Sequence, residues 1–141
     1  MPESRSKRVL QLRFPARAKE LKKIREAVRR GVTDCGCSAK SAADIVLAID
    51  EACQNIIRHA YRGDSDDVIE LEVERRGENL VFSLADHAPA IDPSRVKPRD
   101  LEDVRPGGLG THFIRRVMDE VEFERPASGR GNLLKMVRRI D

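Results

Sequence analysis

Tryptophan is absent from this 141-residue sequence, and aromatic residues make up only 4% of it. Proteins that read single-stranded nucleic acid commonly stack the bases on aromatic side chains, so such a role is not expected. Neither sign of charge dominates, because 27 lysine and arginine residues are mixed with 24 aspartate and glutamate residues and leave a net charge of +3. Mixed charges form a solvated surface rather than a stripe that follows phosphates. We therefore expect no direct nucleic-acid partner.

Long hydrophobic runs are missing as well. A transmembrane helix needs about 20 consecutive apolar residues, and the polar first residues, MPESRSKR, do not resemble a signal peptide. The three cysteines are an odd number in a chain without an export signal, which is typical of reduced thiols in the cytoplasm. We expect a cytoplasmic protein with no membrane association.

Two of the cysteines, Cys35 and Cys37, lie close together in the segment TDCGCS. A structural zinc site normally has four ligands, and no second cluster of cysteine and histidine accompanies this pair. A loop between two helices explains the segment more simply than a metal or redox site does.

The sequence does contain the hydrophobic periodicity of an α/β domain. Residues 8–14 alternate apolar and polar side chains, as a half-buried strand does. A helix is predicted at about 16–31, with Gly31 as its C-terminal stop. A longer helix is predicted at about 39–61, because an apolar stripe recurs along it and Ser38 can serve as its N-cap.

The middle of the chain predicts a hairpin followed by a long loop. Strands are expected at 68–75 and 79–85, with a turn at 77–79 between them. Residues 86–107 contain four prolines and several charges, so regular structure is not expected there. Long irregular loops in compact domains are usually functional, and a lid over a site is one such case.

The last third of the chain completes the domain. A helix is predicted from Gly110 to about Asp119, followed by strands at 121–125 and 132–140. We expect one domain over residues 1–141, with residues 1–7 as a flexible N-terminus. The order of elements predicts an α/β two-layer sandwich in which a mostly antiparallel sheet packs against helices.

Two groups of polar residues suit a ligand. Glu51 and Asn55 are four residues apart and share one face of the long helix, and His59 extends that face by a turn. Asp86 follows a predicted strand, where a carboxylate can accept a hydrogen bond from a ligand's amino group. Each group has an ordinary explanation when taken alone: a solvated helix face for the first and a turn-forming aspartate for the second.

A third group is the run of glycines at 107–110, which leads into a predicted helix. Glycines let the backbone approach a phosphate, and a helix N-terminus offers free N–H groups. The sequence contains no G-x-x-x-x-G-K-[ST] loop and no G-x-G-x-x-G after a strand, so the two common phosphate-binding motifs are excluded.

In this order, the three groups resemble the motifs of the GHKL (Bergerat-fold) ATPases. DEACQNIIRHAY at 50–61 resembles their N-box, DHAPAIDP at 86–93 their first glycine box, and GGLGTHFIRRVMDEV at 107–121 their second. The sequence looks most like the anti-sigma-factor serine kinases, in which His-Ala-Tyr and Met-Asp-Glu-Val recur at these places. The resemblance extends from about residue 10 to the C-terminus.

The resemblance implies a role for each matching residue. Glu51 matches the general base, Asn55 the residue that helps to hold Mg²⁺, and Asp86 the aspartate that binds the adenine amino group. Residues of the second glycine box match those that fold over the phosphates, namely Gly108, Leu109, Gly110 and Thr111. The implied cofactors are ATP and Mg²⁺, and residues from about 87 to 107 would form the ATP lid.

The function that the resemblance implies is that of an ATP-dependent protein serine kinase and anti-sigma factor. Its partners would be a sigma factor and a STAS-type anti-sigma-factor antagonist, which it phosphorylates in a partner-switching pathway, and a second copy of itself. One departure stands out, because Ala88 and Ala90 occupy positions where the family's first box usually has glycine. They keep open an alternative: a non-catalytic regulatory module that sequesters a partner and has a structural or degenerate nucleotide site.

A histidine kinase is a further alternative, and it is disfavoured. That class needs a phosphoacceptor histidine on a separate dimerisation helix. The three histidines, His59, His87 and His112, all lie within the motifs above, and no such helix is predicted before residue 8.

Overall fold

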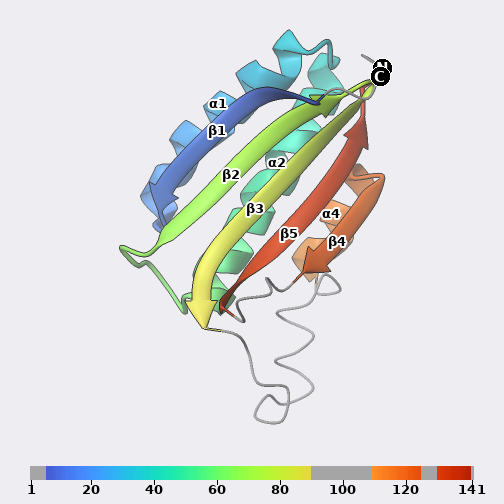
Figure 1. Cartoon of the computed structure of the whole chain (residues 1–141). Coiled ribbons are helices and arrows are strands. Elements are labelled where there is room, and N and C mark those ends of the chain that lie inside the picture. Colours follow the sequence, from blue (N-terminus) through green and yellow to red (C-terminus); the bar gives the residue numbers. More distant parts are fainter. Residues whose placement is uncertain (1–5, 90–108, 125–129, 141) are drawn as a thin grey trace.

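A five-stranded antiparallel sheet forms one layer of the computed structural model, and α-helices cover one of its faces as the second layer (Figure 1). The structure describes residues 6–89, 109–124 and 130–140. The strands, in the spatial order β1-β2-β3-β5-β4, are β1 (Ser6–Pro15), β2 (Val68–Arg76), β3 (Asn79–Pro89), β4 (Glu120–Glu124) and β5 (Arg130–Arg139). The helices described are α1 (Leu21–Asp34), α2 (Ala39–Asn55) and α4 (Leu109–Val117), with a 3₁₀ turn η2 (Ala18–Glu20) and a π-helical turn η3 (Ile56–Ala60). The predicted two-layer sandwich is confirmed.

Alternation along the strands decides which face of the sheet the helices cover. The inward side chains of β2 are fully buried, namely Ile69, Leu71 and Val73. Leu71 pairs with Leu12 of β1 on one side and with Leu84 of β3 on the other. Because paired residues in an antiparallel sheet point to the same face, these side chains form continuous apolar rows under the helices.

The first helix differs from the prediction at both ends. It begins at Leu21, after the 3₁₀ turn, and continues to Asp34. Gly31 is therefore inside α1 and does not end it, so the predicted stop is wrong. A Cβ atom at this glycine would lie 3.3 Å from Val9 Cγ1, which indicates that the glycine permits close packing of α1 on β1.

The second helix lies between α1 and α4 and forms the centre of the helical layer (Figure 1). Ser38 is its N-cap, as predicted, and its Oγ accepts a hydrogen bond from Ser41 N at 3.1 Å. The apolar stripe is buried, with Ile45, Ile49 and Cys53 at most 1% exposed. The α-helix ends at Asn55, however, and the last turn of the predicted helix is π-helical.

The third strand is longer than predicted and includes Asp86. Its register with β2 continues to the pair Ile69–Asp86, and β3 ends only at Pro89. The prediction that Asp86 follows the strand and opens the lid is therefore wrong. Residues 87–89 of the predicted lid belong to β3, and residues 90–107 lie outside the described part of the chain.

Smaller differences concern the two ends of the domain. β1 begins at Ser6, so the last two residues of the predicted flexible N-terminus belong to a strand. Helix α4 ends at Val117 rather than Asp119, and Arg138 Nη1 donates to Val117 O at 2.6 Å there. This bond satisfies a carbonyl oxygen that the end of a helix leaves without an intrahelical partner.

All three cysteines have free thiols in the structure. Cys35 follows α1 and Cys37 precedes Ser38 at the start of α2, so the pair lies in the connection between two helices, as predicted. No group of three or more histidine, cysteine, aspartate or glutamate side chains within the described ranges is arranged to hold a metal ion. Of the helices that the structure describes, none has the length and apolar character needed to span a membrane.

Candidate functional site

Three of the predicted site segments meet at one end of the molecule. Figure 1 shows that the end of α2, the end of β3 and the beginning of α4 lie at the same end of the molecule. β5 also begins at this end, because it runs antiparallel to β3. The fold thus brings together residues that are far apart in the sequence.

Glu51 and Asn55 lie one turn apart in α2, as predicted. The side chain of Glu51 is 26% exposed, so it is neither buried in the core nor fully solvated. Arg58 Nη2 donates to Asn55 Oδ1 at 2.9 Å and lies 3.6 Å from Glu51 Oε1. One guanidinium therefore contacts both residues, a contact that the sequence analysis did not predict.

The neighbouring carboxylate, Asp50, has a different role. Arg25 Nη1 of α1 lies 2.8 Å from Asp50 Oδ1, and Gln54 Nε2 donates to Asp50 Oδ2 at 2.6 Å. The contact with Arg25 joins α1 to α2, and the bond from Gln54 lies within α2 itself. Of the two adjacent acids, Asp50 is the one bound to Arg25 of α1, and Glu51 lies near Arg58 instead.

The π-helical turn η3 ends the N-box helix. Tyr61 N donates to Ile56 O at 3.0 Å, and the chain then leaves the helix through Arg62 and Gly63, which both have positive φ. Single π turns within helices occur frequently at functional sites. His59 lies in this turn, but among the described residues no hydrogen bond joins it to Glu51 or Asn55.

Asp86 is a buried carboxylate within the sheet, only 5% exposed. Ala88 N and Asn132 Nδ2 both donate to its Oδ1, at 3.0 and 3.1 Å. Burial raises the pKa of Asp86, and the hydrogen bonds from Ala88 and Asn132 oppose that rise. Both of these bonds are accepted by Oδ1, and a further hydrogen bond from the backbone N–H of Asn132 also lowers the pKa of this carboxylate.

A bulge holds this carboxylate in place. The register between β3 and β5 shifts between Asp86 and Pro89. Gly131 lies opposite with a φ of +79°, and a Cβ atom there would lie only 2.3 Å from Asp86 O. Only glycine therefore allows β5 to approach Asp86 closely enough for Asn132 to reach it. The sequence analysis missed both Gly131 and Asn132, and the only available signal was a Gly-Asn pair at the start of a predicted strand.

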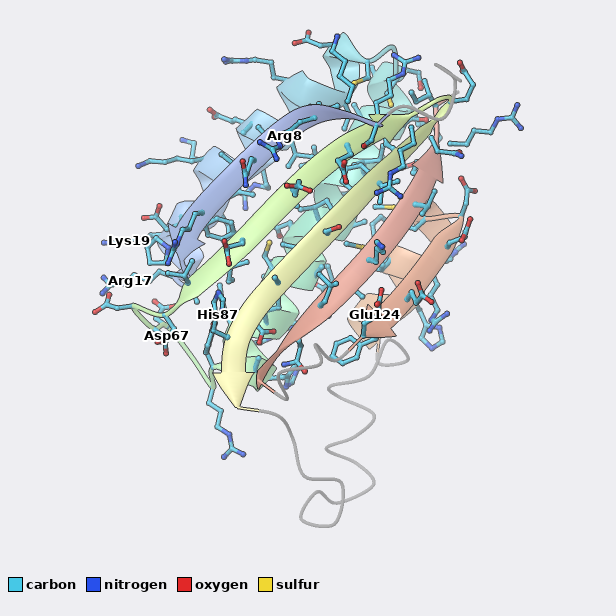
Figure 2. All side chains as sticks on the ribbon, in the orientation of Figure 1. Arg8, Arg17, Lys19, Asp67, His87 and Glu124 are labelled. Atoms are coloured by element: carbon cyan, nitrogen blue, oxygen red, sulfur yellow. The ribbon has the colours of Figure 1, made fainter. Side chains whose placement is uncertain are left out.

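Tyr61 ties the N-box to the sheet beside Asp86. Its hydroxyl donates to Val68 O at 2.8 Å and accepts from His87 N at 2.7 Å. The hydroxyl thereby bridges β2 and β3 just beyond their last register pair. Burial raises the pKa of Tyr61, and the hydrogen bond from His87 opposes the rise. The His87 side chain lies near the end of β3 in Figure 2, with its Nε2 2.9 Å from Glu70 Oε1.

The second glycine box coincides with the start of α4. Leu109, Gly110 and Thr111 lie in the first turn of the helix, and Gly108 lies outside the described residues. Helix α4 packs beside α2, so its N-terminus lies at the same end of the molecule as Glu51 and Asn55 (Figure 1). A helix N-terminus favours negative charge through its free N–H groups and its dipole.

A surface pocket of about 540 Å³ lies away from the residues discussed above. It is lined by residues of β1, β2 and β3, among them Arg13, Glu72 and Ser83, and shares no residue with the group above. We base the candidate site on the side-chain geometry at the end of α2 and β3, because the pocket contains none of the predicted site residues.

The residues present suit a magnesium nucleotide. The carbonyl oxygen of Asn55 and the carboxylate of Glu51 are hard oxygen donors, which Mg²⁺ prefers. The buried Asp86 can accept from an amino group, and the N-terminus of α4 can face phosphates.

Comparisons with known proteins show what the whole domain is similar to. The sequence profile of a family described as the histidine kinase-like ATPase domain matches residues 14–138. The serine-protein kinase RsbW of Listeria innocua is 27% identical over 120 residues, which cover 79% of this chain and 76% of the relative.

Two solved structures have a similar fold. A chain of the SiaB–SiaC complex from Pseudomonas aeruginosa superposes with a TM-score of 0.68 at 18% identity, over 93% of this chain and 91% of that one. The RsbU and RsbW domains of Rv1364c from Mycobacterium tuberculosis give a TM-score of 0.65 at 20% identity, over 93% of this chain and 32% of that longer one.

Proposed function

We propose that this chain, which belongs to the family of histidine kinase-like ATPase domains, is an ATP-dependent protein serine kinase. The observation that carries the proposal is the placement of Asp86. Its carboxylate is buried, held through one oxygen by Ala88 and Asn132, and lies at the same end of the fold as the Glu51–Asn55 face of α2. Relatives named serine-protein kinases support the same activity.

Each predicted residue has a distinct task in this proposal. Asp86 accepts a hydrogen bond from the adenine amino group, and Asn55 is the protein ligand of Mg²⁺. Glu51 would accept the proton of the substrate's serine hydroxyl as its oxygen bonds to the γ-phosphorus, while the bond from that phosphorus to the bridging oxygen breaks and ADP leaves. The bound Mg²⁺ supplies positive charge against the phosphates, and the chain supplies position. The backbone of Gly108 to Thr111 receives the phosphates.

The partners belong to the same proposal. We infer that the kinase acts on a STAS-type anti-sigma-factor antagonist, binds a sigma factor as an anti-sigma factor, and works as a homodimer in the cytoplasm. These inferences rest on the family resemblance of the motifs at 50–61, 86–93 and 107–121.

The alternative of a non-catalytic binding module rests on the alanines of the first glycine box. Ala88 is 2% exposed, and its N–H donates to Asp86 Oδ1. It is not among the residues with positive φ, so its backbone conformation does not require glycine. Ala88 therefore gives no reason to expect a damaged adenine pocket, and Ala90 lies outside the described residues.

The decisive experiment is phosphate transfer from radiolabelled ATP and Mg²⁺ to STAS-domain proteins of the same cell. We expect label on a serine of one such protein, and no label when Mg²⁺ is removed with a chelator. Binding of both ATP and the partner without any transfer would contradict the kinase proposal and favour the binding module.

A further inference from the structure

Arg58 is the one residue seen to contact both members of the Glu51–Asn55 pair within the described chain. It follows Asn55 by three positions and Glu51 by seven, so all three lie on one face of the helix. Its Nη2 lies 2.9 Å from Asn55 Oδ1 and 3.6 Å from Glu51 Oε1. The pair thus already holds a cation in this structure.

The position of this cation conflicts with that of a metal ion. Mg²⁺ binds oxygen ligands at about 2.0–2.1 Å and demands near-ideal geometry. A metal on Asn55 Oδ1 would therefore place two positive groups on the same oxygen, and like charges at such distances repel each other. The guanidinium and the metal ion therefore compete for this oxygen.

The side chain of Arg58 can move away from Glu51 and Asn55. Its side chain is 53% exposed, and ion pairs at exposed positions are weak. It also lies in the π-helical turn η3 rather than in the regular part of α2. A small free-energy change is sufficient to move it into solvent.

We propose that Arg58 is a positioning residue that occupies the side-chain oxygens of Glu51 and Asn55 in the free protein. Mg²⁺ with its nucleotide must displace the guanidinium to reach them. The proposal rests on the proposed function, because it assigns the metal to Asn55 and the proton transfer to Glu51. In the free protein the guanidinium satisfies the acceptors of the pair. When the metal enters, Arg58 leaves, and Glu51 and Asn55 become available to substrate and metal at the same time. Arg58 thereby sets how much Mg²⁺ the protein needs.

The test is a magnesium titration of ADP binding by calorimetry, which needs no catalysis. Arg58→Gln removes the competing charge, so the Mg²⁺ concentration for half-maximal ADP binding should fall by about three- to fivefold, in keeping with a weak exposed ion pair. ADP affinity at saturating Mg²⁺ should stay within about twofold, because the displaced guanidinium makes no contact with the nucleotide. Arg58→Lys keeps the charge without the planar fork and should give an intermediate value.

Arg62→Gln is the matched control. Arg62 is exposed and lies just after the same helix, and this substitution changes net charge equally. It should leave the Mg²⁺ midpoint at the wild-type value. An unchanged midpoint in Arg58→Gln, with the protein folded as judged by its thermal transition, would overturn the inference.

Weaker ADP binding by Arg58→Gln at saturating Mg²⁺ would also overturn it, because the guanidinium would then be a phosphate ligand. Failure of the proposed function is a different outcome. In that case the wild-type protein would bind no ADP at any Mg²⁺ concentration.

Discussion

At the scale of single residues, Asp86, the proposed adenine ligand, is a carboxylate whose burial has a cost in stability. A carboxylate that is 5% exposed is disfavoured in its charged form, and burial accordingly raises its pKa. Hydrogen bonds from Ala88 and Asn132 offset part of this effect.

Asp86→Asn should separate binding from folding. The side chain keeps its shape and its acceptor Oδ1, but it loses the charge, and a charge-assisted hydrogen bond contributes about 1.5–3 kcal/mol. We therefore expect ATP affinity to fall by more than about tenfold in calorimetry, while the protein remains at least as stable as the wild type at pH 7. Unchanged ATP affinity would refute the adenine assignment.

The pH dependence of stability follows from the sign of the same shift. The folded-state pKa of Asp86 is raised, so the folded protein holds this proton more tightly than the unfolded chain. Its destabilising contribution is present above the raised pKa and disappears as the pH falls through it. The stability advantage of Asp86→Asn over the wild type should therefore shrink on acidification, which urea unfolding at several pH values can measure. A constant difference across this range would contradict the burial argument.

Substitutions of Glu51 and Asn55 should have different effects on binding and on phosphate transfer, although the two residues lie one turn apart. Glu51→Gln keeps size and hydrogen bonding but removes the base, so phosphate transfer should fall by about 10²–10⁴ while ATP affinity changes only a few-fold. Asn55→Ala removes the metal ligand and should lose nucleotide binding and transfer together. Both variants are to be measured against the same partner protein. Transfer at the normal rate by Glu51→Gln would show that the proposed mechanism is wrong.

At the scale of elements, the contact between β3 and β5 determines whether the site can form. Gly131 allows the backbone of β5 to pass within the reach of Asp86, and Asn132 then donates to its carboxylate. On the helical side, Tyr61 fastens the end of η3 to β2 and β3 through its hydroxyl. The Asp86 carboxylate thus has a partner on β5, and the backbone next to it is held by Tyr61.

Gly131→Ala should disrupt this contact. A Cβ atom at 2.3 Å from Asp86 O cannot be accommodated without a shift of β5, and the positive φ adds strain of about 1–3 kcal/mol. We expect a lower free energy of unfolding in urea and weaker ATP binding. Gly63→Ala is the control, because Gly63 also has positive φ but would meet no atom within 4 Å. If the two variants lose equal stability, the close approach of β5 is not important.

At the scale of the whole molecule, the layer arrangement leaves β1 with a free edge. The strand order places β1 and β4 at the two ends of the sheet, and among the described strands β1 pairs only with β2. Unpaired N–H and C=O groups along an edge strand are available to a second chain or a partner.

We expect the N-terminal strand and first helix, Val9 to Val28, to contribute to a homodimer or partner surface. Sedimentation velocity at micromolar concentration should give about twice the monomer mass of 15.9 kDa. A monomer under these conditions, with sigma-factor binding intact, would count against the dimer.

Local patterns in the sequence were sufficient for the elements and their order. The alternation in β2, the apolar stripe of α2 and the cap at Ser38 each depend on residues that are near one another in the chain, so periodicity and side-chain chemistry determine them. The spacing of Glu51 and Asn55 placed them on one face for the same reason. Helix ends were less predictable, because packing of Gly31 against Val9 allowed α1 to continue.

Only the tertiary structure decided what surrounds the site residues. Asn132 reaches Asp86 because β5 pairs with β3, a contact across 46 positions of the chain that no local pattern encodes. The same pairing extends β3 past Asp86 and buries its carboxylate, which raises the pKa. Arg58 was within local reach of Glu51 and Asn55, but several rotamers of an exposed arginine are compatible with the helix, and its contact with both residues became visible only in three dimensions. Sequence determined the residue types and their order, and long-range strand pairing determined the burial and the hydrogen-bond partners of Asp86.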